Sequence, residues 1–386
     1  MSGRSTKRES GFSLMEMVVS MAIGLIVLAA AVQIYIQGVS ATWTVAQRAE
    51  MQQDFRAASN ILTKDLSLAG AGLGNGVAIA LPSGSTPLYG CDQTAKCYLN
   101  GVAGTYPLQG ATPYLYGLLP GYNIGPILNV AQGATDTVTV VYTDSSFYLN
   151  CYTATITAKG VVTFAPAASP TPWPTPGCLP TGVTSPQAVN NTVAGLTAGD
   201  LVLMTLGGNQ VVAEVTGPAT ATGTNSYSVP FANSDVLKMN QTPTGATSGL
   251  NSAALNATGT SPTRILVITY YLDNTVTPSR LMRQISGHSP IPVAENIVYL
   301  KFSYDLFNDS TNTVAVNQPN PGSGDSNDTA STGLLPNQIT KINILNMAID
   351  STLMSSQFGQ GNGYQRLDLQ TSVSARNLTY TNEYPN

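Results

Sequence analysis

The sequence predicts an α+β protein in which one long N-terminal helix packs on an antiparallel β-sheet of an enlarged, loop-rich β domain. Three observations predict this class. An uncharged apolar stretch near the N-terminus runs into a helical pattern, alternating strand patterns recur from residue 136 onward, and segments rich in Gly, Pro, Thr and Asn separate them. Strands that follow one helix, without further helices between them, favour an antiparallel sheet.

The N-terminal region predicts a transmembrane helix. The first eleven residues, MSGRSTKRESG, carry three basic side chains and one acidic one, and no charged residue occurs from Met17 to Gln47. About 20 helical residues cross the hydrocarbon core of a bilayer, which is the length of the stretch from Met17 to Ile36. We expect a membrane span over about residues 14–36, with the basic end in the cytoplasm by the positive-inside rule.

Glu16 decides between three interpretations of this region. A secretory signal peptide usually has a shorter apolar segment and a small-x-small cleavage site, which Ala29-Ala30-Ala31 would resemble. A plain signal anchor would keep the whole segment. Neither explains Glu16, because a carboxylate at the edge of an apolar span is costly and indicates a function.

The segment Gly11-Phe12-Ser13-Leu14-Met15-Glu16 resembles the type III signal of prepilins, the precursors of type IV pilins. The resemblance implies that prepilin peptidase cuts after Gly11 on the cytoplasmic side and methylates the new amine of Phe12. Glu16 is then the fifth residue of the mature chain. The implied organisation is a leader over 1–11, an N-terminal pilin helix region over 12–74 and an extracytoplasmic β-rich domain over 75–386.

Physical chemistry gives each of these three residues a role. Glycine before the cut lets an extended backbone enter the peptidase without a side chain. The amine of Phe12 is then a positive charge inside an apolar helix bundle, where an unpaired charge is expensive. Glu16 can pair with the amine of a neighbouring subunit and thereby set the axial register of subunit assembly.

The helical pattern continues beyond the apolar span. Apolar residues recur at steps of three and four along one stripe, formed by Met51, Phe55, Ala58, Leu62, Leu66 and Ala69. Glycines at 70, 72 and 74 end it. We therefore expect one helix from near Phe12 to about Leu68, roughly 85 Å long at 1.5 Å per residue.

The remaining chain alternates between strand patterns and long loops. Strands are expected at 136–142, at 152–164 with a turn at Lys159-Gly160, at 200–206 with 210–215, at 264–272 with 279–285, at 297–304, and at 339–349 with 366–375. Loops are expected at 77–135, 166–180, 217–262 and 308–333.

Short segments along the chain, in their order, resemble PilW-like minor pilins. They are Arg56 and Asp65 leading to Ala69-Gly70, then 136–140, 270–272, 281–283, 295–297 and 372–378. This resemblance covers about half of the chain, by our comparison of segment order, and leaves 77–135, 165–195 and 217–262 unmatched. It implies a pilin-like fold and a minor pilin of a type IV pilus. A minor pseudopilin of a type II secretion system has the same plan and stays as an alternative.

The resemblance also implies partners and a location. The partners are other pilins and minor pilins, prepilin peptidase, the inner-membrane pilus assembly machinery and the membrane itself. The protein is expected in the bacterial inner membrane as a single-pass protein with a cytoplasmic N-terminus, and then in the pilus at the cell surface. Nucleic acid is not expected as the main partner, because the net charge is −4 and binding would need a concentrated basic surface.

Cys91, Cys97, Cys151 and Cys178 are the four cysteines. An even number fits two disulfides in an oxidising compartment, and nearest-neighbour pairing would join Cys91 to Cys97 and Cys151 to Cys178. Four cysteines allow three connectivities, and four free thiols are a further alternative. No C-x-x-C spacing occurs and His288 is the single histidine, so no metal site is expected.

No catalytic motif or cofactor-binding motif is present, and we expect a protein that is not an enzyme and has no cofactor. His288 precedes Ser289 in a turn bounded by Gly and Pro, where a histidine is commonly a surface residue. Acidic and amide residues gather near one polar loop: Asp305, Asp309, Asp325, Asn327 and Asp328. They lack EF-hand spacing, which favours a solvated loop over a calcium site. A pilus-borne adhesin and a membrane-anchored enzyme remain the alternatives from other classes.

Overall fold

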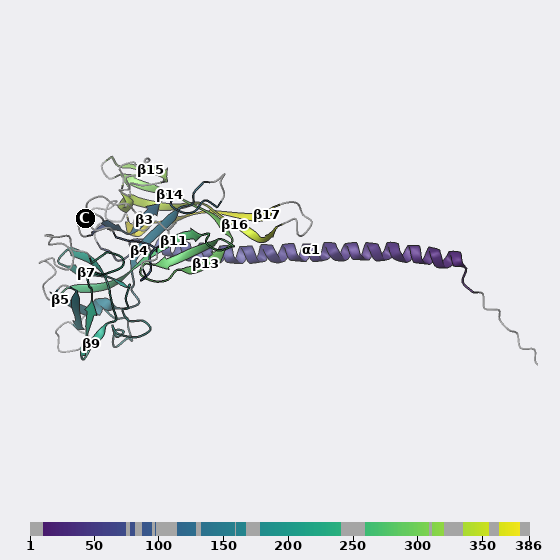
Figure 1. Ribbon diagram of the computed structural model, residues 1–386. Coiled ribbons are helices and arrows are strands. Elements are labelled where there is room, and N and C mark those ends of the chain that lie inside the picture. Colours follow the sequence, from purple (N-terminus) through teal and green to yellow (C-terminus); the bar gives the residue numbers. More distant parts are fainter. Residues whose placement is uncertain are drawn as a thin grey trace, which may run out of the picture. The chain divides into compact units, whose positions relative to one another are not determined.

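The computed structural model describes residues 11–74, 78–81, 87–94, 97, 114–128, 133–158, 160–166, 178–240, 259–308, 311–319, 335–354 and 363–378. The chain divides into two compact units, residues 1–52 with 351–365, and residues 53–350 with 366–386. One helix followed by antiparallel sheets makes this an α+β protein, as the sequence predicts (Figure 1).

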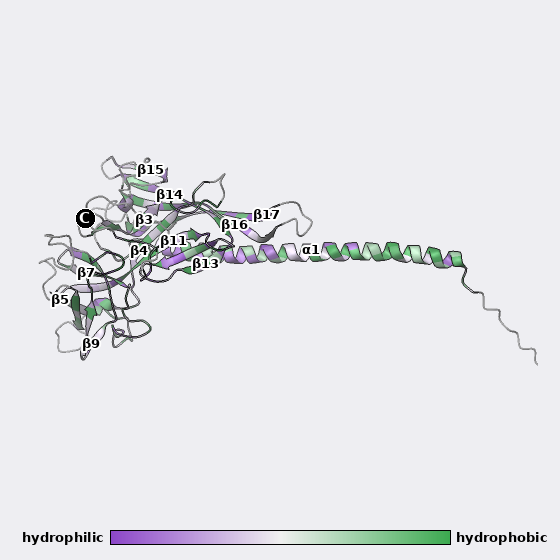
Figure 2. Cartoon of the chain, viewed as in Figure 1, coloured by the Kyte–Doolittle hydropathy of each residue, from purple (hydrophilic) through white to green (hydrophobic). Residues whose placement is uncertain are grey.

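The helix α1 runs without a break from Leu14 to Ser67. Its N-terminal part is predominantly hydrophobic and its C-terminal part is mixed (Figure 2). Along the C-terminal part, the predicted stripe is buried, with Ala58, Leu62, Leu66 and Ala69 each 0% exposed. The helix ends at glycines that adopt positive φ, and a Cβ on Gly72 would meet the Thr143 side chain at 2.1 Å.

The largest sheet has seven strands and lies in the second unit. Its main path, in spatial order, is β13 (Ile291–Glu295), β12 (Arg280–Ile285), β11 (Ser261–Asp273), β4 (Thr137–Thr143) and β3 (Leu118–Gly121). The long strand β11 also pairs with β7 (Leu201–Leu206), and β7 pairs with β8 (Asn209–Glu214). β7 and β12 thus share one side of β11, β7 along its start and β12 along its end, and β4 pairs with the other side.

Two four-stranded sheets and one two-stranded sheet complete the described strands. One sheet has the order β5 (Tyr152–Ala158), β6 (Val161–Pro166), β10 (Ser226–Pro230) and β9 (Thr220–Gly223). Another has the order β15 (Thr313–Gln318), β14 (Ile297–Asn308), β16 (Ile339–Met354) and β17 (Tyr364–Ser374). The small pair is β1 (Ala78–Ala80) with β2 (Tyr114–Tyr116), and two short 3-10 helices are η1 (Leu149–Cys151) and η3 (Pro336–Gln338).

The predicted hairpins are confirmed where alternation and a turn signal coincide. β7 and β8 join through Gly207 and Gly208, both at positive φ, and β11 and β12 pair with Asp273 opposite Arg280. β16 and β17 are neighbours in one sheet, as the pairing of the C-terminal segments predicts. Lys159, at the expected turn between β5 and β6, lies outside the described residues.

The prediction of long loops is wrong at several places. Segment 77–135 contains β1, β2 and β3, segment 217–262 contains β9 and β10, and segment 308–333 contains β15. β13 was also not predicted. These strands are short, and β9 and β15 carry few apolar residues, so their own sequences show little alternation. They form because a neighbouring strand already offers an edge to pair with.

A second hydrophobic core supports the sheet of β5, β6, β10 and β9. Phe147, Tyr152, Phe164 and Phe231 are among its buried residues. Pairs of these rings meet edge to face, with Phe164 and Phe231 centroids 6.4 Å apart. The sheet of β5, β6, β10 and β9 therefore has a hydrophobic core of its own. A single sheet covered by one helix would not need this second core.

Candidate processing and assembly site

The described residues around the predicted cleavage point lie outside regular structure and are exposed. Gly11, Phe12 and Ser13 precede α1 without regular structure, and the Phe12 side chain is 82% exposed. A Cβ on Gly11 would meet nothing within 4 Å, so nothing else in the described chain requires a glycine there. The peptide bond between Gly11 and Phe12 therefore lies just outside the helix, where a protease can bind an extended backbone.

Ser13 places the start of the helix. Its Oγ accepts the N–H of Met15 at 3.3 Å, and its carbonyl accepts the N–H groups of Glu16 and Met17 at 3.0 and 3.2 Å. Ser13 is thus the N-cap, and the Ser-x-x-Glu spacing to Glu16 is the sequence signature of a capping box. We did not predict this cap, although the spacing was visible in the sequence. It explains why α1 begins at Leu14 rather than at Phe12.

Glu16 lies in the first turn of α1, where a carboxylate favours the positive end of the helix dipole. Its backbone carbonyl accepts the Ser20 hydroxyl at 2.7 Å. Within the described part of the chain, its carboxylate has no hydrogen-bond or ion-pair partner. The side chain is exposed and remains available to a positive group of another molecule.

The helix that follows exposes its apolar side chains. Met21 and Ile34 are each 71% exposed and Ile26 is 69% exposed. α1 is long and apolar enough to cross a membrane, which by itself is weak evidence for a span. The exposure adds to it, because such a surface requires lipid or other helices around it.

Residues 6–32 match the family model of the prokaryotic N-terminal methylation motif. The match includes Gly11, Phe12, Glu16 and most of the apolar helix, and it supports a type IV pilin-like protein that prepilin peptidase processes. No curated protein and no solved structure matches the chain. The comparison therefore covers the processing signal and leaves the β-rich region without a relative.

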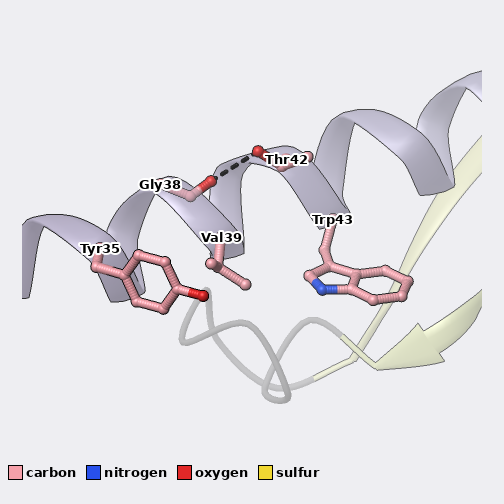
Figure 3. A pocket seen from close by; sticks show the side chains of 5 residues that line it. All are labelled: Tyr35, Gly38, Val39, Thr42 and Trp43. Atoms are coloured by element: carbon pink, nitrogen blue, oxygen red, sulfur yellow. Dashed lines mark hydrogen bonds between the residues drawn. The ribbon is translucent and has the colours of Figure 1, made fainter. Parts of the chain in front are cut away.

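An aromatic stripe follows the apolar part of α1. Tyr35, Val39 and Trp43 line a pocket at four-residue spacing, together with Gly38 and Thr42 (Figure 3). The Thr42 hydroxyl donates to the Gly38 carbonyl at 2.8 Å, so its polar atom is satisfied along the helix. Tyr and Trp are enriched where a membrane span meets water, which suits Tyr35 at the expected end of the span and Trp43 two turns beyond it.

A buried charged cluster fastens the C-terminal part of α1 to the largest sheet. Asp65, 4% exposed, accepts hydrogen bonds from Tyr142 at 3.0 Å, Tyr270 at 2.6 Å and Arg283 Nε at 2.7 Å. Tyr270 and Arg283 are direct cross-strand neighbours on β11 and β12. Burial, followed by the Asp65 charge, raises the pKa of both tyrosines, so their hydroxyls stay protonated and donate. We call these four residues the Asp65 cluster.

The Asp65 cluster joins segments that carried the PilW-like resemblance. Asp65, Tyr270 and Arg283 come from three of the quoted segments, which lie up to 218 residues apart. Asp136 comes from another of the quoted segments. Its carboxylate accepts hydrogen bonds from Lys301 Nζ at 2.7 Å and from the N–H of Phe302 at 3.0 Å. These residues therefore hold elements together, and sequence order alone did not reveal that they meet.

The cysteines form two disulfides, Cys91–Cys97 and Cys151–Cys178, which is the nearest-neighbour pairing among the three connectivities. The first ring is fixed to β12, since the Gly287 N–H donates to the Cys91 carbonyl at 2.9 Å. No group of three or more possible metal ligands occurs in the part of the chain that the structure describes.

His288, which we expected to be a surface residue, has a carboxylate partner. Its Nε2 lies 3.1 Å from Asp200 Oδ1. The pair bridges the loop before β7 and the loop after β12. Gly199 and Gly287 approach each other there so closely that a Cβ on Gly287 would meet Gly199 O at 2.3 Å. Because the two loops cross here, the contact between His288 and Asp200 links two segments of the chain.

The polar-loop acids are only partly described. Asp305 lies in β14, where its Oδ1 accepts the Asn317 N–H at 2.9 Å and the Asn343 side chain at 3.0 Å. It therefore supports the pairing of β14 with its neighbours. Asp309, Asp325, Asn327 and Asp328 lie outside the described residues.

A buried carboxyl pair, Glu214 and Asp235, lies behind the first disulfide ring. Glu214 is 0% exposed and accepts Gln93 Nε2 at 2.6 Å and the Leu237 N–H at 2.7 Å. Asp235 forms a side-chain hydrogen bond with it. Burial, with the nearby Asp235, raises the pKa of Glu214 from 4.5 to about 7.

Because of this carboxyl pair, we expect the free energy of unfolding of the β-rich region to fall as pH rises. In the unfolded chain Glu214 releases its proton near pH 4.5, whereas the folded chain keeps it until about pH 7. The contribution of Glu214 to the free energy of unfolding is about 3 kcal/mol in total. It is fully present below pH 4.5 and is lost as pH rises through about 7. Denaturant unfolding from pH 4 to 8 measures this slope. Glu214→Gln should flatten it, and an unchanged slope in that variant would contradict the assignment.

Proposed function

We propose that this protein is a PilW-like minor pilin, a subunit that primes, caps or decorates a type IV pilus. The observation that carries the proposal is the arrangement at the N-terminus. The methylation motif matches residues 6–32, the bond between Gly11 and Phe12 is exposed just before a capped apolar helix, and the Glu16 carboxylate has no partner within the described chain. Such a helix becomes stable only among other helices or in lipid.

The proposed sequence of events follows from these groups. The chain inserts into the bacterial inner membrane with its N-terminus in the cytoplasm, and prepilin peptidase cuts after Gly11 and methylates the amine of Phe12. The apolar helices then pack laterally, and Glu16 pairs with the positive amine of a neighbouring subunit. The β-rich region is carried outward to the pilus surface. The role is assembly and not catalysis.

A minor pseudopilin of a type II secretion system is the second candidate, because the methylation motif supports both kinds of subunit. Isolation of sheared surface pili separates the two. A minor pilin is recovered with the pili, whereas a pseudopilin is absent from them and secretion fails when its gene is deleted.

Processing is the first test of the proposal. Mass spectrometry of the protein from cells should find mature chains that begin at N-methylated Phe12. Gly11→Val should leave the leader attached, because a branched side chain obstructs the extended backbone before the cut. Gly24→Val, the same substitution where a Cβ meets nothing within 4 Å, should be processed normally. Wild-type chains that begin near Ala31, or at Met1, would contradict the proposal.

A further inference from the structure

β17 is the longest edge strand among the strands that the structure describes. It is the last strand of its sheet, and it spans 11 residues without a proline. The other edge strands of the described larger sheets are shorter, and several are interrupted: β9 has 4 residues, β3 has 4 and contains Pro120, β13 has 5 and contains Pro292, β8 has 6, β15 has 6 and a register shift against β14, and β5 has 7 and a register shift against β6. Proteins usually shorten, bend or block an edge of this kind, because its free backbone groups pair with other strands.

The direction of the free backbone groups follows from two hydrogen bonds. The N–H of Gln365 donates to Ser351 Oγ at 3.0 Å, and the N–H of Ala375 donates to the Thr340 carbonyl at 2.9 Å, both on β16. Backbone groups alternate sides along a strand, so the odd-numbered residues face β16. The even-numbered residues from 366 to 374 direct their N–H and C=O groups to the open side, and their side chains are exposed in strict alternation.

The start of β17 lies beside α1. In the first unit, Arg48 Nε donates to Gln365 Oε1 at 2.9 Å. Arg48 is the first charged residue after the uncharged stretch that ends at Gln47. The first residues of β17 therefore lie next to the part of α1 that follows the apolar stretch.

We propose that β17 binds an edge strand of a different, neighbouring subunit of the filament and so extends the sheet across the subunit boundary. This rests on the proposed function. Two β17 strands would pair through a two-fold axis, which a polar filament with all N-terminal helices pointing one way does not have. The other described edge strands of this chain have at most 7 residues, so a strand that pairs along all 11 residues of β17 belongs to another pilin-like subunit.

Charge indicates what the partner strand carries. Arg366 and Asp368 are exposed on the same face, and the residues that follow there, Gln370, Ser372 and Ser374, are neutral. Arg366 also pairs with Asp350 through two bonds, at 2.6 and 2.9 Å, which holds its guanidinium along the sheet. A complementary strand has an acidic residue opposite Arg366, a basic residue opposite Asp368 and polar residues beyond.

The matched pair of variants is Gln370→Pro and Gln370→Ala in the full chain. Proline removes an N–H that points to the open side and leaves the bonds to β16, whereas alanine keeps the N–H. Gln370→Pro should lower incorporation into sheared pili about tenfold, as expected from lost edge pairing, and Gln370→Ala should not. Asp368→Lys leaves the backbone intact and should also lower incorporation into sheared pili. It tests the edge pairing independently if the proline variant is misfolded.

A cross-link identifies the partner. All four native cysteines are in disulfides, so Ser372→Cys carries the one free thiol for a photoreactive maleimide. The expected product joins it to a strand of another subunit with a methylated N-terminus. A product between two copies of this chain, no product, or normal incorporation of Gln370→Pro and Asp368→Lys would overturn the proposal. If wild-type chains are cut at Phe12 and incorporated in those cases, the proposed function stands. Wild-type chains that are neither cut nor incorporated would refute the function itself.

Discussion

Glu16→Ala is expected to leave cleavage after Gly11 largely intact and to remove the protein from filaments. We expect cleavage in the segment before the helix, and the N-cap that ends this segment is Ser13, which the substitution does not change. Incorporation brings the amine of Phe12 into an apolar bundle, where the loss of its partner costs roughly 3–5 kcal/mol. That cost lowers incorporation by more than about a hundredfold.

Immunoblots of sheared pili, with mass spectrometry of the mature N-terminus, measure the two effects separately. Glu16→Gln should fail as Glu16→Ala does, because the amide keeps the shape of the side chain and loses its charge. Glu50→Ala removes an exposed glutamate from the same helix outside the apolar stretch, and it should incorporate normally. Normal incorporation of the Glu16 variants would refute the charge pairing.

Asp65→Ala is expected to lower the free energy of unfolding by about 3–5 kcal/mol. The substitution leaves Arg283 as a half-buried charge without its carboxylate, and it removes the acceptor of two buried tyrosine hydroxyls. It also detaches the last turns of α1 from β11 and β12. The effect should exceed that of any exposed substitution on the helix, which is usually within about 0.5 kcal/mol.

Denaturant unfolding of the full chain in detergent measures this loss, with Asp54→Ala on the same helix as the control. The double variant Asp65→Ala with Arg283→Met should recover part of the stability, because it removes the unpaired charge that the single change creates. A single variant that unfolds like the wild type would show that the Asp65 cluster does not stabilise the fold.

Features that depend on neighbouring residues were predictable from the sequence. The processing signal, the stripe of α1 from Met51 to Ala69 and the hairpin at Gly207-Gly208 each depend on spacing within a few residues. The cap at Ser13 belongs to the same kind and was available in the Ser-x-x-Glu spacing. Helix periodicity and turn chemistry are local, so a single sequence carries them.

Features that depend on distant residues were not predictable in this way. β9 and β15 are strands because a neighbour offers them an edge, and His288 meets Asp200 because two loops cross. The division of the β-rich region into several sheets also depends on which strands find each other. Loop closure over long separations leaves no pattern in the sequence of either partner.

The sequence by itself determined the methylation motif and the apolar helix of this protein, because both are linear patterns of neighbouring residues. Only the tertiary structure decided what the β-rich region offers. It brings Asp65 to Tyr270 and Arg283, and it leaves β17 as a long open edge. Both depend on strand order, and strand order is set by contacts between residues far apart in the chain.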